Sequence, residues 1–190
     1  MSRLLAFLLV LGLIGCDGGD PAAIFEGEVA GVEIGDGPTY VSLRAAARGA
    51  TAVLPASAAA TTQWDLAFDG AEVRLNGGSS GPGTAIGVVL ATPFTSVTDA
   101  LREDVAYRRD GDSPCFSGPP RAVCTGPGEG LLGETDGQIV PVLGRVLLLR
   151  LADGRGYAKL QVESVMESPG GAPRLAFRFA LNPEGSSFEE

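Results

Sequence analysis

The chain has 190 residues, of which 45% are hydrophobic, and carries a formal net charge of −9. A strongly acidic chain is a poor partner for nucleic acid, whose affinity depends on Lys and Arg contacts to phosphates, and it does not lie flat on anionic lipid. The sequence has no histidine, which excludes Ser-His-Asp and Cys-His catalysis and HExxH zinc sites. No pair of acidic residues is marked out for glycosidase chemistry, so we predict a protein that is not an enzyme.

The N-terminus has the layout of an export signal. Arg3 precedes an apolar run over residues 4–14, which is shorter than the roughly 20 residues that cross a bilayer. Residues 13–16 read Leu-Ile-Gly-Cys and resemble a bacterial lipobox, in which the cysteine is acylated and becomes the first mature residue. The alternative is an ordinary signal peptide that happens to contain a cysteine.

We therefore predict a lipoprotein signal peptide over residues 1–15, an acylated Cys16, and a tether that ends at residue 23. A lipid anchor of several acyl chains holds a protein lastingly at a membrane. The expected location is the bacterial cell envelope, at the outer membrane or the cell surface. The mature chain, without Arg3, carries a net charge of −10 because Arg3 is the only charged side chain of the signal.

The first half of the predicted domain, which spans residues 24–181, reads as strands. Residues 24–54 are strand-like, with repeated glycines that interrupt the apolar positions, and residues 40–44 form a run of their own. Residues 56–62 are small and polar, which predicts a loop or, alternatively, an alanine-rich helical turn.

Residues 64–68 carry the period-2 pattern of a half-buried strand. Trp64, Leu66 and Phe68 fall on one side of an extended chain, and Asp65 and Asp69 fall on the other. We predict that Trp64 is a core anchor and that the two aspartates are solvated.

A glycine-rich loop over residues 77–83 follows a second short alternating run. It lacks the Lys-Ser/Thr of a P-loop and the GxGxxG spacing, and no clear helix follows it, so we interpret it as a tight turn between strands. Residues 86–90 are a continuous apolar strand. Residues 94–102 are compatible with a short helix or a loop.

Residues 103–141 differ in composition from the rest of the chain. They are rich in Gly, Pro, Asp and Glu and cannot bury enough apolar surface to order themselves as a separate core. An insertion of this length in a compact domain is a functional loop or a disordered one. Residues 110–112 read Asp-Gly-Asp, but they lack the spacing of an EF-hand calcium loop, and we interpret them as an acidic turn.

Cys115 and Cys124 lie nine residues apart within this insertion. Export places them in an oxidising compartment, where cysteines form disulfides. A zinc site is the rival interpretation, but zinc requires three or four Cys, His or carboxylate ligands, and nothing nearby completes such a set. We therefore predict a Cys115–Cys124 disulfide.

The C-terminal part predicts a three-stranded antiparallel meander. Residues 145–151 are apolar enough for a central strand, and an Asp-Gly pair follows as a hairpin turn. Residues 157–163 and 175–181 alternate between apolar and polar positions, with a Pro-Gly-Gly turn between them. The last residues, 182–190, read as a ragged polar tail.

Two blocks of the sequence resemble the HmuY-like family of bacterial lipoproteins, which includes haem-binding proteins. The first block, residues 63–92, contains WDLAF, VRLN and the glycine loop; the second, residues 144–181, contains an ADG turn followed by YAKLQ. The resemblance implies an all-β domain of two packed antiparallel sheets with little helix. It also implies a thumb-like extension that closes a ligand cleft, and this extension corresponds to residues 103–141.

The best-known members of the family hold the haem iron with two axial histidines, and this chain has no histidine. The resemblance therefore gives no axial haem ligand for this chain. Haem iron also accepts Met, Tyr or Cys thiolate, and the two cysteines of the insertion are excluded if they are paired. The remaining candidate ligands are Tyr107, near the start of the thumb, and Met166, the only methionine besides Met1. No metal site is predicted.

Two functions fit these features. The first is a lipid-anchored binding protein for haem or another small apolar ligand. The second is a structural or interaction lipoprotein that has lost the haem site and contacts a surface protein or glycan through its disulfide-stapled thumb. A ligand-binding thumb would pack apolar side chains toward the sheet, and its candidates are Phe116, Val123, Leu131, Leu132 and Ile139.

Overall fold

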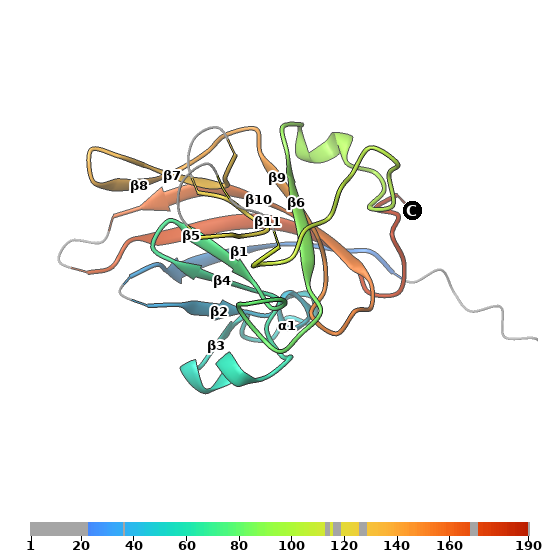
Figure 1. Ribbon diagram of the computed structural model, residues 1–190, viewed down its shortest axis with the longest axis horizontal. Coiled ribbons are helices and arrows are strands. Elements are labelled where there is room, and N and C mark those ends of the chain that lie inside the picture. The colour runs from blue at the N-terminus through green and yellow to red at the C-terminus, as the bar shows by residue number, and fades with distance from the viewer. Residues whose placement is uncertain are drawn as a thin grey trace, which may run out of the picture.

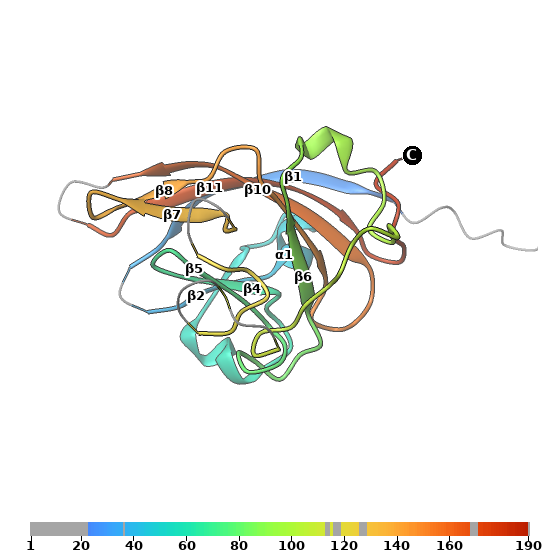
Figure 2. The same cartoon turned by 45° about the horizontal axis from the view of Figure 1, so that its top comes forward.

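A computed structural model describes residues 23–35, 37–112, 115, 119–125, 129–167 and 171–189. Two antiparallel sheets pack face to face, and a separate hairpin lies at one end of the larger sheet (Figures 1 and 2). Helix is confined to one short α-helix and two short 3-10 helices within these residues. The predicted all-β, two-sheet fold class with little helix is confirmed.

The larger sheet has five strands in the order β1-β11-β10-β9-β6, and every neighbouring pair is antiparallel. Its strands are β1 (Phe25–Glu33), β6 (Ile86–Leu90), β9 (Val146–Arg150), β10 (Tyr157–Met166) and β11 (Arg174–Asn182). The last three strands form the meander that the sequence predicts. Its centre is the pairing of Leu160 with Leu147 on one side and with Phe179 on the other.

The smaller sheet has four strands in the order β3-β2-β4-β5. They are β2 (Thr39–Val41), β3 (Val53–Leu54), β4 (Leu66–Asp69) and β5 (Glu72–Leu75). The sequence predicts a single run over residues 40–44, but β2 ends at Val41 because Ser42 accepts a hydrogen bond from the Ala45 N–H and so caps a helix.

The remaining elements are short. Helix α1 (Leu43–Ala47) follows that cap, and the alanine-rich stretch forms the 3-10 helix η1 (Ala56–Ala60). Of residues 94–102, only Phe94–Ser96 are helical, as the 3-10 helix η2. The thumb contains a hairpin of its own, formed by β7 (Leu132–Thr135) and β8 (Gln138–Pro141).

The main core lies between the two sheets. Phe68 of the smaller sheet faces Phe177 of the larger one, with ring centroids 6.1 Å apart. Leu147 and Leu149 of β9 join this core, whereas Val146 and Leu148 of the same strand pack on the outer face. Strand β9 is therefore buried on both faces, as its continuous apolar sequence predicts.

A second, smaller core covers one end of the outer face of the larger sheet. Phe94 and Val97 pack there against Leu148 and against Phe188, which is 7% exposed. The Phe188 N–H donates to the Thr98 carbonyl at 2.7 Å. The expected ragged polar tail is thus anchored on the sheet through its single aromatic residue.

The strand predicted over residues 64–68 is present as β4, which begins at Leu66, but it is buried on both faces and not on one. Trp64, Ala67 and Phe68 are all 1% exposed or less, so both faces of β4 are buried. Tyr40 packs edge-to-face on Trp64, with centroids 5.0 Å apart, and Ala58 of η1 joins the same cluster. The pattern places Trp64 on the same face as Leu66 and Phe68, but Trp64 packs with Ala67 in this cluster, whereas Leu66 and Phe68 belong to the main core. Trp64 is therefore buried as predicted, but in a separate cluster.

Candidate functional site

Asp110 fastens the start of the thumb to the body of the domain. Its carboxylate is 1% exposed and accepts hydrogen bonds from the Leu75 N–H at 2.9 Å and the Ala122 N–H at 2.8 Å. Its own carbonyl accepts from the Ser79 N–H in the glycine-rich loop. The predicted acidic turn is present, but Asp110 is a buried link between β5, the glycine-rich loop and the thumb rather than a solvated carboxylate.

The glycine-rich loop acts as a tight turn that packs onto neighbouring groups. Gly78 has a φ of +59°, and a Cβ there would overlap the Asp110 carbonyl. A Cβ at Gly81 would overlap the Asn76 carboxamide and the Trp64 indole. These two positions require glycine because of backbone conformation and close approach.

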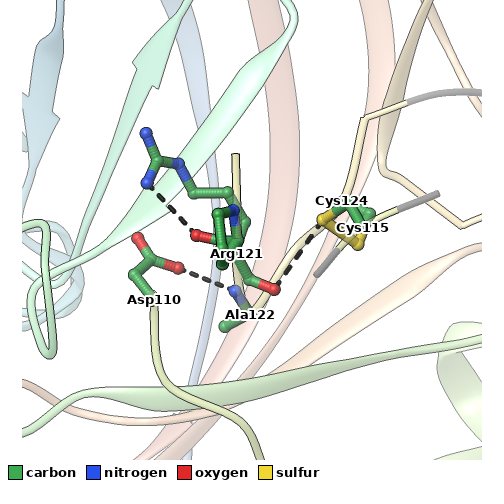
Figure 3. Close-up of a disulfide and its surroundings, with 6 residues drawn as sticks. Asp110, Cys115, Arg121, Ala122 and Cys124 are labelled. Carbon is green, nitrogen blue, oxygen red and sulfur yellow. Dashed lines mark hydrogen bonds between the residues drawn. A yellow bond between two sulfur atoms is a disulfide. The ribbon is translucent and has the colours of Figure 1, made fainter. Parts of the chain in front are cut away.

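The two thumb cysteines are joined, as the sequence predicts. Figure 3 shows the Cys115–Cys124 disulfide beside Arg121 and the Asp110–Ala122 hydrogen bond, and the two Cα atoms are 5.4 Å apart. The disulfide therefore closes the thumb loop close to the point where Asp110 holds it.

Removing the disulfide is expected to lower the free energy of unfolding by about 2–3 kcal/mol, because the unfolded chain regains loop entropy. Urea denaturation of a Cys115→Ser/Cys124→Ser variant, measured beside the oxidised wild type, tests this value. An unchanged midpoint would show that the Asp110 hydrogen bonds alone order the loop.

The apolar side chains of the thumb fill the gap between the sheets. Val123, Leu131 and Leu132 are each 1% exposed or less and belong to the main core, and Ile139 packs against it. Phe116 lies outside the described residues. The thumb thus points its apolar residues toward the sheet, as a ligand-binding thumb would, but they contribute to the core itself.

A pocket of about 230 Å3 lies between the thumb and β6. We call it the thumb pocket. Its polar lining is Arg108, Glu129 and Arg145, and its other lining residues are Val88, Val89, Ala122 and Cys124. Its volume is below the roughly 300–1,000 Å3 of pockets that take drug-sized ligands.

Tyr107, the first candidate haem ligand, packs on the outer face of the larger sheet. Its hydroxyl donates to the Ala100 carbonyl at 3.0 Å, and its ring lies 5.9 Å from that of Tyr157. Burial raises the pKa of the Tyr107 phenol above its usual value. The hydroxyl is therefore already hydrogen-bonded, and its ionisation is disfavoured.

Met166, the second candidate, is 56% exposed at the far end of β10. Tyr107 contacts Tyr157, the first residue of that strand, and β10 has ten residues. At about 3.3 Å per residue, the two candidates lie roughly 30 Å apart. The structure does not bring them together, so they cannot ligate one iron from both sides.

Asp65 is buried at 4% exposure, which corrects the prediction that it is solvated. Its two carboxylate oxygens accept from the Leu43 N–H at 2.9 Å and the Ala152 N–H at 3.1 Å. Burial raises the pKa of this carboxyl to about 6, although the two N–H donors act in the opposite direction. Asp69 is half-buried and pairs with Arg74.

Lys159 is a buried cation that the alternating pattern of β10 does not reveal. It is 4% exposed, and its ammonium group donates to the Phe94 carbonyl at 3.2 Å and the Val97 carbonyl at 2.8 Å. It also lies 4.5 Å from the Phe94 ring centroid and 5.2 Å from that of Phe188. Lys159 therefore ties both covering segments to the sheet, and burial lowers the pKa of its amine.

Two further features bear on the site. Cys16, the predicted acylation site, lies outside the described residues, and no helix among the described residues has the length and hydropathy to cross a membrane. No group of three or more His, Cys, Asp or Glu side chains in the described part of the chain has the geometry of a metal site.

Comparison with known proteins supports the fold. No protein-family model matches the sequence, and no curated protein matches it significantly. The fold is similar to the crystal structure of the apo HmuY analog (TFO) of Tannerella forsythia, with a TM-score of 0.54 and 13% sequence identity over 87% of this chain and 100% of that chain. The chain thus has an HmuY-like fold.

Proposed function

We propose that this chain is a lipid-anchored binding protein of the bacterial cell envelope that takes haem or another small, largely apolar ligand. The observation that carries the proposal is the HmuY-like fold, in which the thumb, the segment expected to close a ligand cleft, is fastened to the domain by Asp110. The lipobox that ends at Cys16 supports the membrane anchor.

Haem binding in this chain would differ from binding by two histidines. The chain contains no histidine, and its two candidate ligands lie at opposite ends of β10. We therefore expect at most one protein ligand to the iron, with the rest of the affinity coming from apolar contacts and from arginines that pair with the haem carboxylates.

A haem titration followed by absorbance tests this proposal. Residues 21–190 contain every described element and are suitable as the test protein, beside Tyr107→Phe and Met166→Ala variants. A saturable Soret shift at one equivalent supports a haem carrier, and loss of that shift in one variant identifies the iron ligand. A response no different from that of haem added to buffer would remove haem from the proposal.

A protein or glycan partner is the second candidate function. The observation that favours it is that Val123, Leu131 and Leu132 of the thumb fill the main core, which leaves a thumb pocket of only about 230 Å3. In this alternative, the disulfide-bonded part of the thumb contacts the partner. Replacing both residues of the partly buried Arg121–Glu72 ion pair beside that loop with Ala would then weaken partner binding, but it would leave small-ligand binding unchanged.

A further inference from the structure

A hollow of about 480 Å3 opens on the outer face of the larger sheet and shares one lining residue, Arg145, with the thumb pocket. Gln161 of β10 and Arg178 of β11 form its floor, and residues 91–95 and 143–145 form its walls. Figure 2 shows the η2 segment and the turn between β8 and β9 rising above the same side of the sheet. We call this hollow the outer groove, and its volume lies in the usual range for small-ligand pockets.

Arg178 is held in one orientation at the floor of the outer groove. Its Cζ lies 4.4 Å from the Phe94 ring centroid, and its Nη2 donates to Gln161 Oε1 at 2.7 Å. Its Nε lies 3.3 Å from a Glu163 carboxylate oxygen. Its Nη1 donates to no residue that the structure describes, so the N–H groups of this nitrogen can donate hydrogen bonds to a ligand.

The lining of the outer groove joins positive charge to apolar surface. Arg145 is a second guanidinium in the lining, and none of the lining residues is acidic, although the whole chain has a net charge of −9. Glu163 pairs with Arg178, and Glu28 of β1 lies opposite Arg178 in the register of the sheet. Pro93 and Leu143, whose exposed fraction is 76%, supply apolar wall.

We propose that the outer groove binds a small amphiphilic carboxylic acid, with the carboxylate on Arg178 and the hydrocarbon against Pro93 and Leu143. A guanidinium presents N–H donors in the geometry that a carboxylate accepts, and its positive charge pairs with the negative charge of the carboxylate. A hydroxyl or an ester carries no such charge. This inference rests on the proposed ligand-binding function and gives it a site and a ligand class distinct from the thumb.

The test is a fluorescence titration of residues 21–190 with a dansylated long-chain carboxylic acid and, separately, with its methyl ester. We expect saturable binding of the acid at one equivalent and weaker binding of the ester. Arg178→Gln should weaken binding of the acid about tenfold or more, the effect of losing one charge-assisted hydrogen bond. Leu143→Ser should weaken it several-fold without harm to the fold, because Leu143 is largely exposed.

The matched control is Arg174→Gln, which removes the same charge from the same strand at an exposed ion pair with Glu33. This variant should bind the acid like the wild type. Equal affinity of the wild type, Arg178→Gln and Leu143→Ser for the acid would overturn the inference, as would equal affinity for acid and ester.

Haem is titrated in parallel, so that a failure of the proposed function can be distinguished from a failure of the outer-groove proposal. Haem binding without binding of the acid would overturn the proposal that the outer groove binds a carboxylic acid, and it would still support the proposed function. Arg178-dependent binding of the acid without haem binding would support the outer groove and remove haem as the ligand.

Discussion

Replacing Asp110 with alanine is expected to lower the free energy of unfolding by about 3–5 kcal/mol, because two buried backbone N–H groups lose their acceptor. Those groups belong to Leu75 in β5 and Ala122 in the thumb, 35 and 12 residues away along the chain. The loss therefore releases the thumb from the smaller sheet as well as leaving unpaired donors. Urea denaturation followed by circular dichroism measures the change.

Asp110→Asn separates hydrogen bonding from packing. The amide keeps the shape of the carboxylate but offers one acceptor oxygen and a donor group in place of two acceptors, so we expect a loss close to that of alanine. Asp112→Asn, at an exposed position in the same turn, is the control and should change stability by less than about 0.5 kcal/mol. Wild-type stability of Asp110→Asn would contradict this account of the thumb.

The second large effect is a pH dependence of the free energy of unfolding, which arises from the buried carboxyl group of Asp65. Its pKa is raised from 3.8 to about 6 in the folded protein, mainly because of burial. The folded state therefore binds this proton more tightly than the unfolded state does, so the contribution of Asp65 to stability falls as the pH rises from about 4 to about 6. A shift of this size corresponds to about 3 kcal/mol.

Comparison with Asp65→Asn isolates this effect, because all other carboxylates are common to both proteins. Between pH 4 and pH 7, the wild type should lose about 3 kcal/mol of unfolding free energy relative to the variant, and the difference should level off above pH 7. Urea titrations at half-unit pH intervals provide the values. A difference that does not change with pH would show that the two N–H donors offset the cost of burying the charge.

The strands of the larger sheet could be predicted because their signal is local. In β10 and β11, apolar side chains alternate with polar ones, and the apolar set faces the main core as period 2 requires. Strand β9 has no alternation, and its burial on both faces follows from that. The helix cap at Ser42 also had a local signal, a serine at the start of Leu-Arg-Ala-Ala-Ala, which a strand interpretation of residues 40–44 overlooks.

The buried polar residues could not be predicted because their partners are distant in sequence. Asp65 bonds to the N–H of Ala152, 87 residues away, and Lys159 bonds to carbonyls 62 and 65 residues away. Each of these side chains occupies a position that alternation assigns to solvent. Only the tertiary structure, which lays η2 and Phe188 over Lys159, shows that these positions are covered.

The proposed function depends on whether the natural protein carries a small molecule. The most direct measurement is a native mass spectrum of the mature chain isolated from its own envelope in mild detergent. We predict a chain that begins at an acylated Cys16 and carries one small-molecule adduct per chain. A spectrum with no such adduct, in which the chain instead retains a stoichiometric protein partner, would contradict the binding-protein account.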